Sequence, residues 1–476
     1  MSVESVLVEY EDKIENKIYA NSGSLILNNY VIITSNVLVQ IITKINGWRD
    51  KLQSLKCGFS EPEKLFKAQP ELNVVMNSIN PYRSKTGQVL AIYTSQFIRK
   101  EITTYFKDWT IDEDDKTKQI KELLSTFFII ALTEETFASG INNFKQCLNQ
   151  INETYSQSYI RVGQKIIIDG TPFGNRHFLR TQSKGIVSNL LGPGKCFILT
   201  DTPTAPGSEG SPIYLKSKKK PYGYPIGIVL ASLTWWRGEW IGLTLGGTFS
   251  GIFSDILTRN KDFADLNEDL DRVYVVPDVL NHSIVQVVSG SSWGSGILLD
   301  KENGVFITNS HVVETSSPTL IWEDIEIKSK LVYKSGENEV YDIAILAADL
   351  PSLKETKMEA VKISTNKIIL GETAFAAGFP LFPQTIKPRP TLTKGCISHV
   401  TPSMIKTTCS VLPGSSGGAI LNKSGELLGI IVCNTRLNGN MSAVPRINMA
   451  VPITNIIDVI LNYLETKSKE FVLILY

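Results

Sequence analysis

The sequence predicts an all-β protein with two similar halves. Residues 297–299 and 305–307 are apolar runs joined through an Asn-Gly pair, which is typical of a β-hairpin. The apolar runs at 343–346 and 427–432 also have the length of strands rather than of helices. The same succession of runs and turns occurs twice in the 476 residues, which indicates two copies of one fold.

The size and composition of the chain narrow the classes of function. The chain is long enough for two or three domains, and its 42% hydrophobic and 20% charged residues are ordinary for a globular protein. A net charge of +1 gives no electrostatic reason to expect a nucleic-acid or membrane partner. No apolar run approaches the roughly 18 residues of a membrane-spanning helix, and residues 1–15 lack the features of a secretory signal. The sequence therefore predicts no membrane span and no nucleic-acid partner.

The six cysteines do not form the framework of a disulfide-rich protein, because they are few for a chain of this length. None of them has the spacing of a metal-binding motif. We expect free thiols, a reducing or intracellular compartment, and no metal site.

One glycine-rich turn has the properties of a nucleophilic site. Residues 414–418 read Gly-Ser-Ser-Gly-Gly, between two apolar runs, and present Ser416 among residues without bulky side chains. A nucleophilic serine needs a base and backbone N–H donors for the oxyanion that forms on the substrate. The amides of Gly414 and Ser416 are the expected oxyanion hole. The alternative for such a turn alone is an ordinary hairpin loop.

Two further residues fit the chemistry that Ser416 requires. His311 stands where the second strand of the predicted hairpin ends, and Asp342 leads into the next apolar run. The order His311, Asp342, Ser416 along the chain is one of the three known orders for a hydrolase triad.

The combination of motifs resembles the trypsin-like serine proteases and is most similar to their Deg/HtrA branch. The resemblance covers residues 275–465. Its motifs are Gly-Ser-Gly at 294–296, Ile-Thr-Asn-Ser-His-Val-Val at 307–313, Asp-Ile-Ala-Ile-Leu at 342–346 and Gly-Ser-Ser-Gly-Gly-Ala-Ile at 414–420.

The resemblance implies tandem trypsin-like units, each a pair of antiparallel β-barrels, with a helix at the C-terminal end. It also implies the roles of the triad. Ser416 attacks the scissile carbonyl, His311 takes and returns the proton, and Asp342 orients the imidazole. No metal or organic cofactor is required, and the partners are protein or peptide substrates.

The first half repeats the motifs without the chemistry. Residues 22–27, 31–39, 181–188 and 206–213 parallel the motifs of the second half. The sequence comparison places Val37 opposite His311, Phe128 opposite Asp342 and Glu209 opposite Ser416. None of these three side chains can perform the role of its counterpart, so the first half is predicted to be a protease-like unit without a triad.

The expected domain boundaries follow from this repeat. Residues 1–258 form the degenerate unit, which is longer than its counterpart and is expected to carry an insertion at about 41–120. The polar stretch 259–274 is expected to be a linker, and residues 275–476 the catalytic unit.

A degenerate protease-like unit in front of a catalytic unit resembles the peroxisomal leader-peptide-processing proteases. This implies cleavage of targeting presequences from imported peroxisomal enzymes and a peroxisomal location. The chain ends in Leu-Ile-Leu-Tyr rather than in a Ser-Lys-Leu-type signal, so cytoplasm is the alternative location. The alternative functions are a Deg/HtrA-like intracellular quality-control protease and a non-catalytic peptide-binding scaffold. A homo-oligomer is left open.

The specificity pocket is expected near the serine turn. Its predicted walls are Ser410, Val432, Cys433 and Asn434, by their positions relative to Ser416. No acidic residue stands at position 410, so a preference for Lys or Arg is not expected. Cys433 and Asn434 indicate a pocket for small or uncharged side chains.

Overall fold

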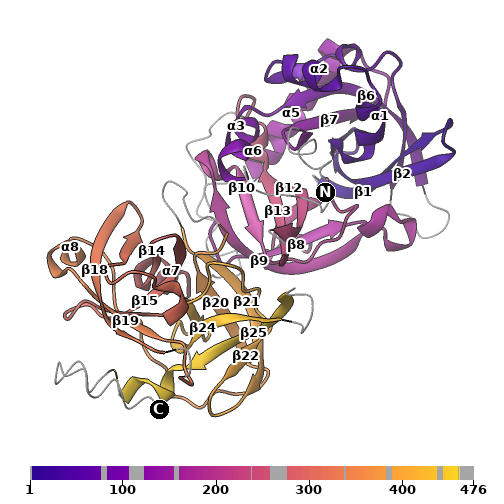
Figure 1. Cartoon of the computed structure of the whole chain (residues 1–476). Helices are drawn as coiled ribbons and strands as arrows, with labels where there is room; N and C mark the ends of the chain where they lie inside the picture. The colour runs from indigo at the N-terminus through magenta and orange to yellow at the C-terminus, as the bar shows by residue number, and fades with distance from the viewer. Residues whose placement is uncertain are drawn as a thin grey trace. The chain divides into compact units, whose positions relative to one another are not determined.

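The computed structural model describes residues 3–76, 83–106, 123–154, 160–236, 239–257, 276–336, 339–381, 389–436, 443–458 and 460. The chain divides into two compact units (Figure 1). The first comprises Met1–Arg237 and Gly242–Arg272, and the second comprises Gly238–Ile241 and Val273–Tyr476. Antiparallel strands form two closed six-stranded barrels in each unit, which confirms the predicted all-β, tandem double-barrel fold.

The first barrel of the first unit closes through the pairing of β6 with β7. A short strand, β4 (Gly58–Ser60), extends its edge beside β6. The strands of the barrel are β1 (Val3–Asp12), β2 (Lys17–Ile26), β3 (Tyr30–Thr34), β5 (Glu71–Met76), β6 (Arg83–Thr94) and β7 (Thr126–Ala131).

The stretch 41–120 contains β5 and β6, so the extra length of this unit is divided between two places rather than inserted as one block. The 3-10 turn η1 (Ser35–Leu38), α1 (Val39–Thr43), α2 (Trp48–Ser54), β4 and the 3-10 turn η2 (Pro62–Lys64) precede β5, and α3 (Gln96–Tyr105) follows β6. Side chains of these added segments, among them Ile42 and Leu52, are buried in the core of the barrel. The segments before β5 therefore extend the first barrel's core.

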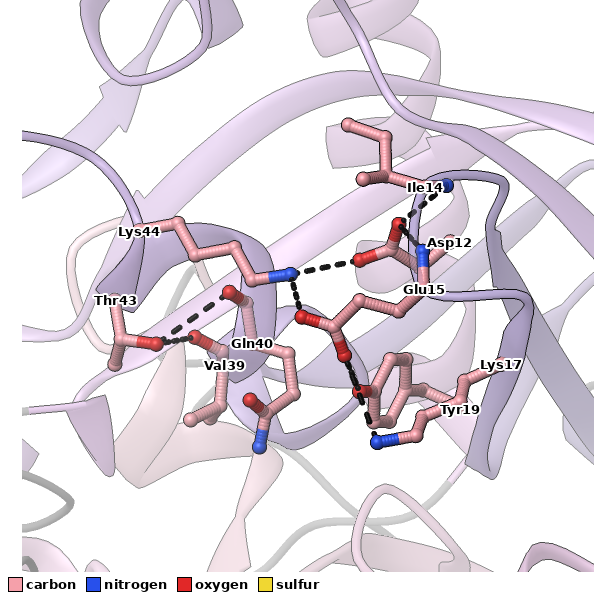
Figure 2. Close-up of polar contacts among 9 residues, drawn as sticks. All are labelled: Asp12, Ile14, Glu15, Lys17, Tyr19, Val39, Gln40, Thr43 and Lys44. Atoms are coloured by element: carbon pink, nitrogen blue, oxygen red, sulfur yellow. Dashed lines mark hydrogen bonds and ion pairs between the residues drawn. The ribbon is translucent and has the colours of Figure 1, made fainter.

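A polar cluster fixes the β1–β2 turn beside α1 (Figure 2). The Nζ of Lys44 lies 2.9 Å from a carboxylate oxygen of Asp12 and 2.5 Å from one of Glu15. Hydrogen bonds from Lys44 lower the pKa of both carboxyl groups. The two carboxylates in turn raise the pKa of Lys44. These three charges link the tip of the hairpin to the segment that follows η1.

The second barrel of the first unit has a mostly aliphatic core that includes Ile166, Val187 and Ile213. Its strands are β8 (Lys165–Gly170), β9 (Thr181–Leu191), β10 (Phe197–Thr200), β11 (Pro212–Leu215), β12 (Tyr224–Trp236) and β13 (Glu239–Thr248). The other elements are α5 (Phe137–Thr154), α6 (Phe249–Ile252) and the 3-10 turns η5 (Pro172–Gly174), η6 (Arg176–Phe178) and η7 (Pro193–Lys195).

The second unit repeats the plan with shorter connections. Its first barrel consists of β14 (Ile284–Ser289), β15 (Ser292–Asp300), β16 (Val305–Thr308), β17 (Thr319–Trp322), β18 (Ile325–Lys334) and β19 (Ala344–Ala348). Its second barrel consists of β20 (Thr373–Gly378), β21 (Thr391–Val400), β22 (Ile405–Thr407), β23 (Ala419–Leu421), β24 (Leu427–Arg436) and β25 (Ala443–Pro452). The remaining elements are α7 (Val276–Ser283), α8 (Leu350–Lys354) and the 3-10 turns η9 (Ser310–Val312) and η10 (Ile453–Asn455).

Two predicted segments fall largely outside the described residues: the linker 259–274 and most of the C-terminal helix, from 461 onward. The described cysteines Cys57, Cys147, Cys196, Cys396 and Cys409 are free thiols. Within the described ranges, no helix is both long and apolar enough to span a lipid bilayer.

Candidate active site

His311 and Asp342 are joined by two hydrogen bonds in the first barrel of the second unit. His311 lies in η9, directly after β16, and Asp342 lies just before β19, which pairs with β16. The imidazole Nδ1 is 2.5 Å from Oδ2 of Asp342, and the backbone N–H of His311 donates to Oδ1 over 3.1 Å. The carboxylate therefore orients the ring and the backbone that carries it.

The environment of Asp342 favours its ionised form. Burial by itself would raise the pKa of this carboxyl. Hydrogen bonds and the charge interaction with His311, together with the backbone N–H groups of His311 and Ser310, outweigh burial and lower the pKa below its usual value. The ionised carboxylate of Asp342 accepts a hydrogen bond from Nδ1–H of His311. This leaves Nε2, the other ring nitrogen, without a proton and able to accept one.

Two polar contacts that the motifs did not reveal hold this pair in place. The side-chain amide of Asn309 donates to the backbone oxygen of Asp342 over 2.7 Å. The hydroxyl of Ser310 donates to the backbone oxygen of Ser335, also over 2.7 Å. Both residues lie in the Thr-Asn-Ser-His run. This motif indicated that they lie beside His311, but it did not indicate which atoms they bind.

Ser416 lies on a tight turn before β23 of the second barrel. The N–H of Ser415 donates to the oxygen of Leu412 over 2.8 Å, and Gly414 has a φ of +94°, a conformation that favours glycine. The Ser416 hydroxyl is partly exposed and donates to the backbone oxygen of Val432 over 2.9 Å. The structure therefore joins His311 directly to Asp342, while the hydroxyl of Ser416 faces the main chain of β24.

The amides of Gly414 and Ser416 have no protein acceptor in the part of the chain that the structure describes. A Cβ on Gly414 would lie 2.5 Å from both the backbone oxygen of Phe379 and Nε1 of Trp293, so only glycine fits at this position. Two free backbone donors beside a serine hydroxyl are what an oxyanion hole requires.

Strand β15 contacts both the histidine turn and the serine turn. The N–H of Ser295 donates to the backbone oxygen of Ser416 over 2.8 Å, and its hydroxyl donates to the oxygen of Gly414 over 2.8 Å. A Cβ on Gly294, the preceding residue, would lie 2.7 Å from Val312 and 2.9 Å from the oxygen of Ser416. The Gly-Ser-Gly motif thus brings the two turns together, a role that sequence reasoning missed although it identified the motif.

The predicted pocket residues are only partly described. Ser410 is buried, and its backbone oxygen accepts a hydrogen bond of 2.8 Å from the Thr393 hydroxyl. Val432 is partly buried and lies against Ser416 through its backbone oxygen. The side chains of Cys433 and Asn434 lie outside the described residues, so the specificity pocket stays a prediction.

The first unit contains a turn with the same backbone geometry. Glu209 occupies the place of Ser416, as the sequence comparison expected. The glycine φ values are +93° at Gly207 and +89° at Gly210, against +94° at Gly414 and +80° at Gly417.

The residue opposite His311 in this unit is Asn36, not Val37 as expected. In η1, a buried serine is followed by the partly buried Asn36 and then by two buried apolar residues. In η9, a buried serine is followed by the exposed His311 and then by two buried valines. The sequence comparison matched the Ile-Thr pairs of the two strands and was therefore one residue out of register.

The residue opposite Asp342 is Thr126, not Phe128. Ala131 pairs with Tyr30, which lies five residues before η1 begins, and Ala347 pairs with Val305, which lies five residues before η9 begins. The two alanines therefore occupy equivalent positions. Asp342 lies five residues before Ala347, and Thr126 lies five residues before Ala131. The first unit therefore has an amide, a hydroxyl and a carboxylate where the second has His311, Asp342 and Ser416.

Comparison with known proteins agrees with this architecture. Residues 294–430 match the trypsin-like peptidase domain. The peroxisomal leader peptide-processing proteases of Homo sapiens and Mus musculus are 32% and 28% identical over 333 and 332 residues, which cover 64% of this chain and 56% of each relative. The serine protease Do-like HtrA of Lactococcus lactis subsp. cremoris (strain MG1363) is 29% identical over 198 residues, which cover 38% of this chain and 46% of that protein.

The chain spans little more than half the length of the first two relatives. The match to the Do-like protease is shorter, whereas the match to the peroxisomal proteases extends over almost two thirds of this chain. The chain thus carries a trypsin-like serine peptidase domain and is homologous to the peroxisomal leader peptide-processing proteases and to the Deg/HtrA serine proteases.

Proposed function

We propose that this protein is a serine endopeptidase that uses Ser416, His311 and Asp342. The observation that carries the proposal is the pair of hydrogen bonds that fixes His311 on Asp342, in a unit whose serine turn keeps two backbone donors free. Ser416 Oγ forms a bond to the scissile carbonyl carbon as His311 takes its proton. The carbonyl oxygen becomes an oxyanion that accepts hydrogen bonds from the amides of Gly414 and Ser416.

The later steps use the same groups. The protonated His311 gives its proton to the leaving amine, which breaks the C–N bond and leaves an acyl group on Ser416. A water molecule then attacks the acyl carbon with His311 as base. This step releases the acid product and regenerates the free serine. The hydroxyl of Ser416 must turn from the oxygen of Val432 toward His311, a rearrangement that fits the loose alignment of catalytic hydrogen bonds in proteins without substrate.

Labelling with a fluorophosphonate tests the catalytic assignment. Such a probe reacts with an activated serine and marks it for mass spectrometry. We expect labelling of Ser416 in the wild-type protein and none in Ser416→Ala or His311→Ala. A folded wild-type protein that stays unlabelled, also in the presence of substrate peptides, would favour the peptide-binding scaffold instead.

We propose targeting presequences of peroxisomal enzymes as the substrates and the peroxisome as the location. Support comes from the names of the two relatives and from the presence of a protease-like unit ahead of the peptidase domain. The test has two arms: cleavage of presequence-bearing precursors by the purified protein, and the position in cells of a copy tagged at its N-terminus. Degradation of unfolded proteins without a cut at the presequence, with a cytoplasmic signal, would support the quality-control alternative.

A further inference from the structure

The serine turn of the second unit and the glutamate turn of the first are built from the same main-chain hydrogen bonds. In the first unit, Gly210 N–H donates to Val229 O over 2.8 Å, and Ser208 N–H donates to Ala205 O over 3.0 Å. The equivalent bonds of the second unit run from Gly417 to Ile431, over 2.9 Å, and from Ser415 to Leu412, over 2.8 Å. The amides of Gly207 and Glu209 therefore stand where those of Gly414 and Ser416 stand.

In the first unit the carboxylate of Glu209 lies at this pair of amides. The N–H of Gly207 donates to Oε2 of Glu209 over 2.8 Å. The side chain of Asn21 donates to the same Oε2 over 2.9 Å. The side chain of Asn36 and the backbone N–H groups of Glu209 and Ser232 also act to lower the pKa of this carboxyl.

Every one of these partners is an N–H donor, so the group that they suit is an anionic oxygen acceptor. Burial raises the pKa of the Glu209 carboxyl, and the hydrogen bonds from its own amide, Gly207 and Asn36 oppose that rise. Asn36, the residue in place of His311, thus favours the ionised form of Glu209, and its amide cannot act as a base.

The carboxylate is also shut off from solvent. Glu209 is 6% exposed, whereas Ser416 at the equivalent position of the second unit is only partly buried. The neighbouring loop closes over the turn, because Phe173 N–H donates to Pro206 O over 2.6 Å. A Cβ on Gly207 would lie 2.3 Å from the backbone nitrogen of Gly174, so the loop and the turn are in close contact.

We infer that the first unit retains a complete oxyanion-binding site and that the side chain of Glu209 is its resident carboxylate ligand. The glutamate does more than replace a nucleophile, since its oxygen takes the place that a substrate's carbonyl oxygen would need. A peptide therefore cannot dock a carbonyl there, and any contact of the first unit with a substrate lies elsewhere. The inference concerns the first unit alone and does not depend on the proposed role of Ser416.

Removal of the ligand tests the inference. Glu209→Ala leaves a small cavity lined by N–H donors, and the loss of its hydrogen bonds should lower the melting temperature by about 5–10 °C. Formate or acetate at millimolar concentrations should restore part of that loss in a saturable way, with chloride at equal ionic strength as the control. A folded Glu209→Ala protein with no saturable gain from either carboxylate would overturn the proposal.

Two matched variants sharpen this result. Glu209→Gln keeps the volume of the side chain and leaves no cavity, so formate should not stabilise it. Ser416→Ala keeps Glu209 in place and leaves two backbone donors on an exposed turn of the other unit, so any gain from formate should be smaller than that of Glu209→Ala. Equal gains for all three variants would mean a general salt effect and would refute a specific site.

Amide hydrogen exchange of the wild-type protein gives a test that needs no variant. The amides of Gly207 and Glu209 should be protected, because both residues are buried and the Gly207 amide is bonded to the carboxylate. The amides of Gly414 and Ser416 should exchange at least about 100-fold faster, since they have no acceptor in the described part of the chain. Equal exchange at the two turns would contradict the inference even if Glu209→Ala failed to fold.

Discussion

The hydroxyl of Ser295 donates a hydrogen bond of 2.8 Å to the backbone oxygen of Gly414, 119 residues further along the chain. The same hydroxyl accepts a hydrogen bond of 2.8 Å from the N–H of Phe379. One side chain thus connects strand β15 of the first barrel with two segments of the second. Because Gly414 supplies a proposed oxyanion donor, Ser295 is placed to position that donor without touching the substrate.

Ser295→Ala should therefore lower kcat by about 10- to 100-fold and leave KM within about threefold, since a poorly aligned oxyanion donor acts on the transition state. Ser22→Ala is the matched control. Ser22 makes the same two bonds in the first unit, to Gly207 O and from Thr171 N, both 2.8 Å. It should cost similar stability and leave kcat unchanged. Equal loss of activity in both variants would show a merely structural role.

Asp342→Asn should reduce kcat by about 10⁴-fold, the size of the effect in the general triad mechanism. The one oxygen of the amide can accept the backbone N–H of His311, which leaves its NH₂ group to donate to Nδ1, so His311 would adopt the wrong tautomer for a base at Nε2. Steady-state kinetics on a cleaved peptide measure this, and circular dichroism checks the fold. Activity within tenfold of the wild type would rule out Asp342 as the residue that orients His311.

The stability supplied by Asp342 should depend on pH at the acid end. The folded protein lowers the pKa of Asp342 below its ordinary value of 3.8. The stabilisation is therefore present above pH 3.8 and is lost as the pH falls through the lower, folded pKa. The difference in melting temperature between wild type and Asp342→Asn should be constant near neutral pH and shrink below about pH 4. A difference that grows on acidification would contradict the direction of this shift.

Gly417→Ala should destabilise the second unit by about 3–5 kcal/mol. A Cβ there would lie 2.1 Å from the oxygen of Ser295 and 2.3 Å from the hydroxyl of Thr308. Gly371 is a matched control, because its φ of +78° is close to the +80° of Gly417 and nothing lies within 4 Å of its Cβ position. Gly371→Ala should cost only the backbone strain, about 1–2 kcal/mol. Urea unfolding of both variants separates steric contact from strain, and equal costs would exclude the contact.

Much of the fold could be predicted because its strands carry a clear apolar pattern. His311 and Asp342 each border such a strand, so their meeting follows from the pairing of β16 with β19. The contacts of Ser295 could not be predicted, because they join its backbone and hydroxyl to backbone atoms of another barrel. The positions of those backbone acceptors depend on the fold. Every residue type has a backbone oxygen, so the sequence does not show which one accepts the bond.

The same limit explains the error of one residue at Asn36. Both candidate alignments of β3 with β16 place most apolar residues opposite apolar residues, and the burial of the residues after the strand decides between them. At Thr126 the alignment is decided by the ladder partners, which the sequence does not display.

The two glycine turns also bear on how such chains diverge after duplication. The bonds that shape each turn run between backbone atoms, so they do not depend on the side chain at position 209 or 416. That central position is free to change while its neighbours are constrained by sterics. A duplicated copy can therefore exchange its nucleophile for another residue without rebuilding the loop. For the same reason, the presence of the turn in a related sequence says little about whether that copy is a working enzyme.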